Sequence, residues 1–333
     1  MENRNSLAVS DEFGRIGGTT VSAIVGQNPW ETAHSAYLKL RHEVDPTPDN
    51  TAMARGRRYE PIVAEIFAGG RPEFRVAHNR LGTDDPELYE HEQYPFLIGH
   101  PDRLLYDANT NQLVAGLEIK TSNWANVRNW GEEGTDAIPR HYLIQCLWYA
   151  GLAKLPEWRV AVAFLDDLGV LRSYREYNVI ADEELYETLV ASAVEFWNNH
   201  VLPGIPPAIG QIDDTTKRWI NRRFPVNVQP LEVATPQEEQ IMARYLMQKE
   251  ALEAAQREFD YVEAALKMAI GDRDGLESET FGKVTWKRSK DSTRVDYRAV
   301  CDELNPSQEL LVKHTKQVEG TRRFVASGLK VNI

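Results

Sequence analysis

Three charged residues in this chain have types and spacing that suggest hydrolytic chemistry. Asp102 lies in a His-Pro-Asp-Arg segment, and Glu118 and Lys120 stand two residues apart in an apolar run further along the chain. Two carboxylates and one ammonium group are the side chains that suit phosphodiester cleavage assisted by a divalent cation. The spacing therefore predicts a metal-dependent phosphodiester cleavage site.

The run that holds Glu118 and Lys120 predicts a buried strand. Residues 114–121 are short, apolar and preceded by Asn-rich turn residues. Because side chains alternate along a strand, Glu118 and Lys120 share one face, while Leu117 and Ile119 point into a packed layer on the other. We expect this layer to hold the polar pair rigidly.

Asp102 is predicted to lie on a neighbouring strand. Residues 89–106 resemble a hairpin with Gly99 near its bend and Asp102 on its second arm. The two carboxylates would then form an oxygen-rich pocket, which suits Mg²⁺, since this ion takes few carboxylates and keeps waters and phosphate oxygens as its other ligands. We expect Mg²⁺ as the cofactor, with Mn²⁺ as a substitute, and Lys120 as the group that stabilises developing negative charge.

Each motif also has a simpler interpretation. A Glu-x-Lys pair on a strand is more often a surface ion pair, and His-Pro-Asp-Arg alone is more often a turn.

Several separated stretches occur in the order found in a known group. The chain resembles the PD-(D/E)XK nuclease superfamily and, within it, the lambda-exonuclease-like, YqaJ-type phage recombination nucleases, over about residues 14–200. The stretches that carry the resemblance are 15–19 with 23–26 and 28–30, then 56–61, 99–102, 116–121 and 142–150.

The resemblance implies a fold and a set of site residues. The implied fold is α/β of a mixed α+β kind, with a restriction-endonuclease-like core in which helices flank a central mixed sheet. The implied catalytic residues are Asp102, Glu118, Lys120 and Gln145. The implied metal ligands are Asp102, Glu118, the carbonyl of Ile119, and Glu60. The implied DNA-binding residues are Arg15, Thr19, Thr121 and Tyr149.

Two of these residues lie on predicted helices. Residues 140–153 have an amphipathic pattern that places Gln145 and Tyr149 on one face, although a buried glutamine bonded to backbone explains Gln145 equally well. Glu60 lies in a helical stretch over 53–67, where the simpler alternative is a solvated residue that pairs with a nearby arginine. Pro61 favours a kink or a first turn there.

One position departs from the family pattern. The arginine expected to hold a terminal 5′-phosphate aligns with Glu12, and Arg15 is close enough to replace it. Thr19 takes the position of the usual serine, and its hydroxyl can still bind phosphate.

The function implied by the resemblance is a metal-dependent DNA exonuclease. It would digest one strand of linear double-stranded DNA in the 5′-to-3′ direction during phage-type recombination and leave a 3′ overhang for a single-strand annealing protein. Ring-forming relatives suggest a homo-oligomer, with a trimer as the candidate. The alternatives are an endonuclease or repair nuclease on the same core, and a noncatalytic DNA-binding assembly protein whose acidic cluster is vestigial.

Charge limits the way in which DNA could bind. The net charge is −12; residues 1–210 hold 18 Lys+Arg against 30 Asp+Glu, and residues 211–333 hold 20 of each. Broad nonspecific adhesion to nucleic acid is therefore disfavoured, since such binding depends on basic side chains. Two basic patches that contain tryptophan, 217–223 and 283–290, could follow a phosphate backbone, but a solvated surface with the tryptophan packed inward is the simpler interpretation.

The 333 residues favour one main domain with an appendage. We expect a nuclease domain over 1–205, a linker over 206–235, and a long helix with a small β segment over 236–333. Within the nuclease domain, the pattern predicts strands over 158–166 and 170–179 and a helix over 182–199. In the appendage, apolar residues after Pro236 repeat at spacings of four and three, which is typical of a coiled coil or helical hairpin. Strands over 281–288 and 321–331 are expected to flank a helix over 296–304.

Targeting signals are lacking in the sequence. No stretch is long and apolar enough for a membrane span, and the first residues lack the regions of a signal peptide. Cys146 and Cys301 have no metal-binding or disulfide spacing and are expected to be reduced. The expectation is a cytoplasmic protein of a bacterial cell, host-encoded or phage-encoded, that does not bind membranes.

Overall fold

The computed structural model describes residues 13–45, 49–78, 89–289 and 296–316. The chain divides into two compact units, residues 1–223 and 224–333. Helix α6 (Asp214–Arg223) falls inside the range expected to be a linker and belongs to the first unit. Its Trp219 packs edge-on against His34, with ring centroids 5.5 Å apart.

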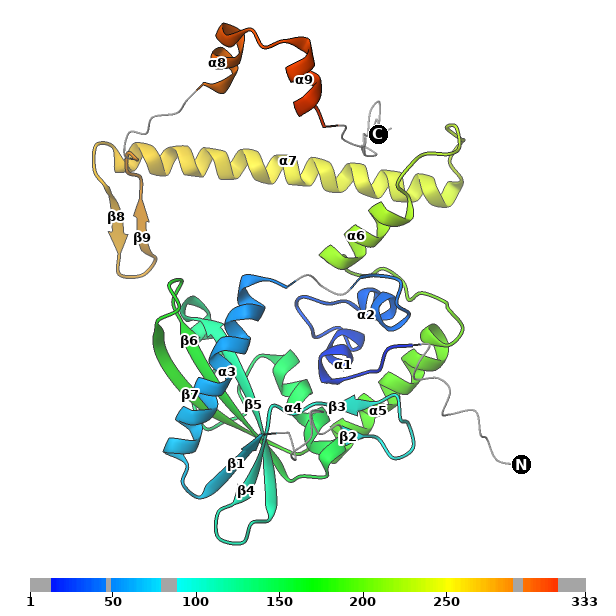
Figure 1. The fold of residues 1–333 in the computed structure, drawn as a ribbon, viewed down its shortest axis with the longest axis vertical. Coiled ribbons are helices and arrows are strands. Elements are labelled where there is room, and N and C mark those ends of the chain that lie inside the picture. Colours follow the sequence, from blue (N-terminus) through cyan, green and yellow to red (C-terminus); the bar gives the residue numbers. More distant parts are fainter. Residues whose placement is uncertain (1–12, 46–48, 79–88, 290–295, 317–333) are drawn as a thin grey trace. The chain divides into compact units, whose positions relative to one another are not determined.

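The first unit is built on a five-stranded mixed sheet with the order β1-β4-β5-β6-β7 (Figure 1). The strands are β1 (Phe74–His78), β4 (Arg103–Asp107), β5 (Leu113–Asn123), β6 (Glu157–Leu165) and β7 (Leu171–Ile180). All neighbouring pairs are antiparallel except β5 and β6. A parallel pair needs a crossover connection, which the 3₁₀ helix Trp124–Asn129 and helix α4 (Arg140–Ala153) supply.

Helices cover both faces of this sheet, as expected for a mixed α/β fold (Figure 1). Helix α3 (Thr51–Gly70) covers one face, where its Val63 and Phe67 pack on Leu117 and Ile119 of β5. The opposite face packs against α4, and both α5 (Glu183–Phe196) and α1 (Gly18–Ile24) pack beside α4. Strand β6 is buried on both sides, so its sequence is almost continuously apolar.

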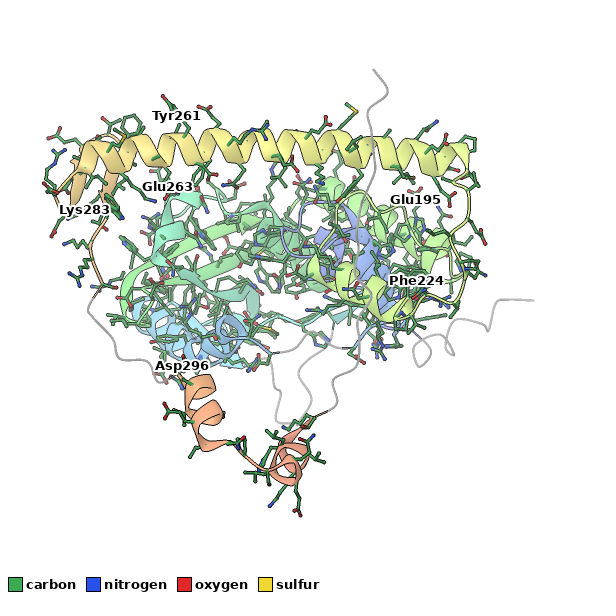
Figure 2. The ribbon with its side chains drawn as sticks, turned by 90° about the horizontal axis from the view of Figure 1, so that it is seen from above. Glu195, Phe224, Tyr261, Glu263, Lys283 and Asp296 are labelled. Atoms are coloured by element: carbon green, nitrogen blue, oxygen red, sulfur yellow. The ribbon has the colours of Figure 1, made fainter. Side chains whose placement is uncertain are left out.

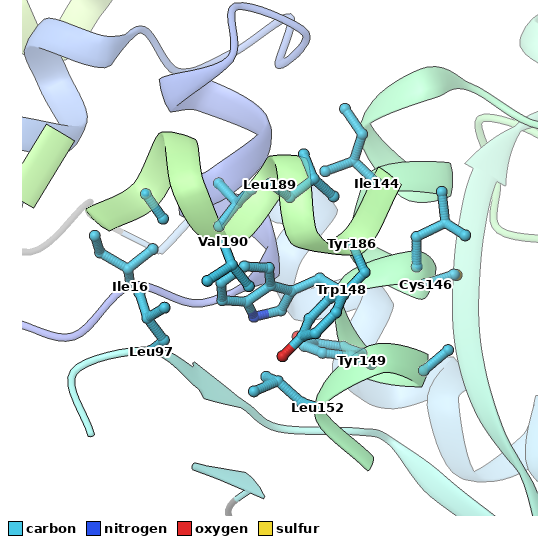
Figure 3. Close-up of a cluster of buried hydrophobic side chains, with 14 of the residues drawn as sticks. Ile16, Leu97, Ile144, Cys146, Trp148, Tyr149, Leu152, Tyr186, Leu189 and Val190 are labelled. Atoms are coloured by element: carbon cyan, nitrogen blue, oxygen red, sulfur yellow. The ribbon is translucent and has the colours of Figure 1, made fainter. Parts of the chain in front are cut away.

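The larger core lies around α4 (Figure 3). Trp148 is fully buried there, and its indole N–H donates to the carbonyl of Ile98 at 2.8 Å. Helix α5 begins at Asp182, whose side chain accepts a hydrogen bond from the backbone N–H of Leu185 at 2.9 Å. A π-helical turn, Trp197–Val201, follows α5 and buries Trp197 in the same core.

One local expectation is wrong, and a second is narrowed. Residues 89–106 do not form one hairpin: β2 (Tyr89–Glu90) pairs with β3 (Ile98–Gly99), whereas β4 joins the main sheet. Pro101 follows this small ribbon, and proline cannot donate a ladder hydrogen bond. Pro61 lies in the middle of α3 rather than in its first turn, so surrounding packing outweighs the loss of one helical hydrogen bond.

The remaining helix of the first unit is α2 (Ala33–Leu40), which begins at a capping box formed by Thr32 and Ser35. The second unit contains the long helix α7 (Pro236–Ile270), a hairpin of β8 (Gly275–Ser278) and β9 (Gly282–Thr285), and the short helices α8 (Tyr297–Leu304) and α9 (Gln308–His314). The strand expected over 321–331 lies outside the described residues. In the part of the chain that the structure describes, no helix has the length and hydropathy needed to cross a membrane.

Close packing of α4 on α5 should make Gly151 sensitive to substitution. A Cβ atom at Gly151 would lie 2.2 Å from Cδ2 of Tyr186. We therefore expect Gly151→Ala to lower the free energy of unfolding by about 1–3 kcal/mol, as overpacked cores do. Urea unfolding followed by circular dichroism would measure the change.

Gly69→Ala is the matched control, because a Cβ at this α3 position would meet no atom within 4 Å. It should leave stability unchanged or raise it by about 0.5–1 kcal/mol. Equal effects of the two substitutions would contradict the packing described here.

Candidate functional site

The sheet register brings Asp102 and Glu118 together. In the antiparallel pair of β4 and β5, Arg103 lies opposite Leu117, so continuing the register by one residue places Asp102 opposite Glu118. Asp102 Oδ2 accepts a hydrogen bond of 2.7 Å from the backbone N–H of Ile119. The structure therefore places the two carboxylates side by side, as the spacing predicts.

Glu118 and Lys120 share the face of β5 opposite α3. The Lys120 ammonium donates to Oε1 of Glu118. Glu118 is only 1% exposed, and its other oxygen, Oε2, is buried and has no hydrogen-bond partner among the described residues. An unpaired buried carboxylate oxygen is costly, so this atom can accept a bond from a ligand that enters the site.

Burial disfavours the ionised form of both carboxylates. Burial and the charge of Asp102 raise the pKa of Glu118 to about 8, although Lys120 opposes the shift. Burial also raises the pKa of Asp102, against the effects of Lys120 and the Ile119 N–H. Burial alone would lower the pKa of Lys120, but Glu118 and Asp102 outweigh it and raise this pKa, so the ammonium remains charged.

Helix α4 covers this polar face with Gln145 and two tyrosines. The Gln145 amide donates to the Tyr149 hydroxyl at 3.1 Å, and Lys120 Nζ lies 4.8 Å from the centre of the Tyr142 ring. Burial and then the nearby Glu118 charge raise the pKa of Tyr149. A Cβ on Gly18 would lie 3.0 Å from Cγ of Gln145, so α1 closes over this residue.

Glu60 lies within electrostatic reach of the site but is held by an arginine. Its Oε1 pairs with Nη1 of Arg103 at 2.7 Å, and its charge raises the pKa values of Asp102 and Glu118 as a minor contribution. Arg103 also donates to the backbone carbonyl of Asp102 at 2.6 Å. Arg103 therefore connects α3 to the segment that carries Asp102, a role that the sequence analysis did not assign.

The remaining predicted site residues are spread over several elements around Asp102 and Glu118. Arg15 is engaged by Glu90, with Nη1 and Oε1 2.5 Å apart, and Thr19 is exposed on α1. Thr121 lies on the α3 side of β5, since its hydroxyl would be 3.8 Å from a Cβ on Gly56. Ile119 contributes its N–H to Asp102, and its carbonyl remains a predicted ligand. The proposed anchor position Glu12 lies outside the described residues.

His141 and Tyr142 are neighbours of the site that the sequence analysis did not select. The His141 ring lies 3.9 Å from that of Tyr142 and 4.7 Å from that of the exposed Trp30. Burial and the Lys120 charge lower the pKa of His141 to about 4. Both residues lie about one helical turn before Gln145, and this spacing was the signal that could have identified them.

The two basic patches are largely engaged in local contacts. In the first, Arg222 pairs with Asp45 at 2.5 Å. In the second, Lys287 pairs with Asp274 at 2.6 Å, and Lys267 lies over the Trp286 ring at 5.9 Å. In the first patch this agrees with the simpler interpretation of a solvated surface, whereas Trp286 of the second patch is 52% exposed rather than packed inward.

Comparison with known proteins identifies the domain that carries this site. Residues 11–155, which include Asp102, Glu118, Lys120 and Gln145, match the model of the YqaJ-like viral recombinase domain. This part of the chain is similar to that domain. The resemblance to the YqaJ-type recombinases is thereby confirmed.

Other similarities extend past this YqaJ-like domain. The uncharacterized protein YqaJ of Bacillus subtilis (strain 168) is 25% identical over 302 residues, which are 90% of this chain and 88% of that protein. Among solved structures, the alkaline exonuclease LHK-Exo of Laribacter hongkongensis has a TM-score of 0.43 at 16% identity and covers 57% of this chain and 90% of its own. A phage-related exonuclease of Haemophilus somnus 129PT has a TM-score of 0.41 at 14% identity, and the match covers 57% of this chain and 96% of that chain.

The raised pKa of Glu118 has a measurable consequence for stability without added metal. Because the folded-state pKa is about 8 and the ordinary value is 4.5, the folded YqaJ-like domain binds more protons than the unfolded chain between these values. In EDTA, the free energy of unfolding should therefore fall as pH rises through this window, by at most about 1.4 kcal/mol per pH unit from this group. The raised pKa of Asp102 also makes the free energy of unfolding fall as pH rises.

Urea unfolding at several pH values would measure this slope, with Glu118→Gln as the comparison. The amide cannot ionise, so the variant should lose most of the slope. Parallel profiles for the wild type and the variant would show that Glu118 does not carry the raised pKa.

Proposed function

We propose that this protein is a Mg²⁺-dependent exodeoxyribonuclease that digests one strand of linear duplex DNA from its 5′ end during phage-type recombination. One observation carries the proposal: Asp102 and Glu118 lie opposite each other on the sheet, and Lys120 contacts Glu118. This is the set of side chains that metal-assisted phosphodiester hydrolysis needs. The YqaJ-like viral recombinase domain supports the context of recombination.

The donor set fits Mg²⁺ in its chemistry. Glu118 Oε2 is buried with no partner among the described residues, and burial raises the pKa of both adjacent carboxylates, so a cation would satisfy both groups at once. No group of three or more His, Cys, Asp or Glu side chains that could hold a metal is gathered among the described residues. Two carboxylates are still sufficient, because Mg²⁺ usually keeps several waters. The carbonyl of Ile119 and the carboxylate of Glu60 are the proposed additional ligands, and Mn²⁺ would substitute.

The chain's own residues have distinct roles in this mechanism. When bound, Mg²⁺ would supply the Lewis acidity that activates water and offsets phosphate charge. Lys120 stays protonated beside Glu118, so it acts as a fixed positive charge that stabilises negative charge developing on the phosphate. Gln145, held by Tyr149, would orient the reacting groups, and α1 would exclude water from that side.

DNA contacts and assembly are part of the same proposal. Arg15, Thr19, Thr121 and Tyr149 are proposed to contact DNA, with Arg15 exchanging Glu90 for a terminal phosphate. The ends of double-stranded DNA are the proposed substrate, a single-strand annealing protein is the proposed partner for the 3′ overhang, and a homo-oligomer with a trimer as the candidate is the proposed assembly.

Mg²⁺ binding should be visible without any substrate. Mg²⁺ at about 100 times its dissociation constant should stabilise the wild type by about 2.7 kcal/mol, which raises Tm. Asp102→Asn and Glu118→Gln should lose this shift, because each removes one charged ligand. An undiminished shift in both variants would place the ion elsewhere, and calorimetry of Mg²⁺ binding provides the independent check.

The nuclease reaction should depend on Lys120. On linear duplex DNA labelled at the 5′ end on one sample and the 3′ end on another, Lys120→Ala should lower kcat on the order of 10²–10³-fold while the Mg²⁺-dependent Tm shift persists. Lys154→Ala is the matched control, since this exposed lysine pairs with Glu92. Equal rates for wild type and Lys120→Ala, or equal DNA loss in Mg²⁺ and EDTA, would refute the proposal.

Closed circular DNA separates this function from its alternatives. An exonuclease should leave the circle intact while it degrades the linear form. Rapid nicking would identify an endonuclease or repair nuclease, and retained DNA binding without cleavage or Mg²⁺ binding would identify a noncatalytic assembly protein.

A further inference from the structure

Helix α7 presents a seam of residues that is apolar except at Gln248. Its positions follow the sequence at alternating spacings of four and three residues, as in a heptad repeat. The seam consists of Ile241, Tyr245, Gln248, Leu252, Ala255, Phe259, Val262, Leu266 and Ala269. Ile241 is 66% exposed, Leu252 69%, Phe259 63% and Val262 53%. Figure 2 shows side chains projecting along the whole helix, with Tyr261 and Glu263 on different sides of it.

We propose that α7 pairs with α7 of a second copy of this chain as an antiparallel coiled coil, in which Leu252 lies opposite the partner's Ala255. This inference concerns assembly, goes beyond the proposed nuclease function and does not depend on it. The size of the seam side chains and the charges that flank them determine both direction and register.

Side-chain size favours the antiparallel direction. In the proposed register, large residues face smaller ones: Leu252 meets the partner's Ala255, and Phe259 meets the partner's Gln248. A parallel in-register pair would instead place Phe259 against its own copy and Ala255 against its own copy. Such layers would be alternately crowded and hollow, which costs stability in a packed core.

Flanking charges favour the same direction. In the proposed register, Arg244 lies beside the partner's Glu258, and Lys249 lies beside the partner's Glu263, so two-fold symmetry gives four attractive pairs. A parallel in-register pair would place Arg244 beside the partner's Lys249 and Glu258 beside the partner's Glu263. Charges at these flanking positions set orientation in coiled coils, because like charges repel there.

Interactions within one helix do not prevent this pairing. Lys249 pairs with Glu253 at 3.9 Å, and Glu263 pairs with Lys267 on the same helix. Exposed pairs of this kind contribute little and are readily shared with a second partner. Shifting the antiparallel register by one heptad in either direction loses both pairs of attractive contacts, so charge also selects the register.

Cross-linking of the full chain tests direction and register. In a Cys301→Ser background, where the remaining Cys146 is buried, Ala251→Cys should react with a short bis-maleimide to give a covalent dimer. Ala251 would lie beside the partner's Ala251 near the two-fold axis. Ala269→Cys should not cross-link, because its own copy lies at the opposite end of the pair. Cross-linking of Ala269→Cys in preference to Ala251→Cys would overturn the antiparallel arrangement.

Mass measurement of the full chain tests the seam itself. Leu252→Asp with Phe259→Asp should abolish α7 pairing and lower the solution mass, and circular dichroism should show that the first unit remains folded. Lys249→Glu should raise the dissociation constant of the pair about tenfold or more, and Lys249→Glu with Glu263→Lys should recover most of this loss. A wild-type mass that does not change on seam substitution would overturn the proposal, whether the seam packs within its own chain or binds a different protein.

Discussion

Burial of Glu118 beside Asp102 is the constraint on which the site depends. Two carboxylates that lie opposite each other in a low-dielectric setting repel and lose hydration, so each needs compensation. The Ile119 N–H and the Lys120 ammonium provide part of it, and Arg103 braces the backbone at Asp102. One oxygen of Glu118 still has no partner in the described residues. That oxygen is the atom through which the proposed Mg²⁺ would bind.

Such a cluster can persist only where the backbone is rigid. Strand β5 is held by hydrogen-bonded neighbours on both edges and covered by helices on both faces. Side-chain alternation separates the chemistry from the packing: Leu117 and Ile119 anchor the strand under α3, while Glu118 and Lys120 face α4. Free energy gained by apolar burial on one side of the strand thus offsets the cost of polar burial on the other.

Much of this arrangement could be predicted from the sequence because its signals are local. The apolar run around Glu118 predicted β5, and the pattern around Gln145 predicted α4 with its exact bounds. The roles of Arg103 and Glu60 could not be predicted, since a helix residue and a strand residue distant in sequence meet only after folding. The hairpin expected around Gly99 was wrong for the same reason. Strand pairing depends on which strands lie nearby in the folded chain, and β4 pairs with β1 and β5 of the main sheet.

The basic side chains of the first unit fall into two classes, and the distinction bears on how an acidic domain could bind DNA. Arg103 is buried and pairs with the partly exposed Glu60, and it is a fixed part of the site because loss of this partner would leave a buried charge uncompensated. Arg15 and Arg222 pair with Glu90 and Asp45 at exposed positions, where an ion pair contributes only about 0–1 kcal/mol. A phosphate could therefore displace either carboxylate at little cost. Binding through such exchanges needs no large positive surface, but it leaves displaced carboxylates near the DNA. Because few phosphates would be neutralised, the affinity would be modest and would depend only weakly on salt.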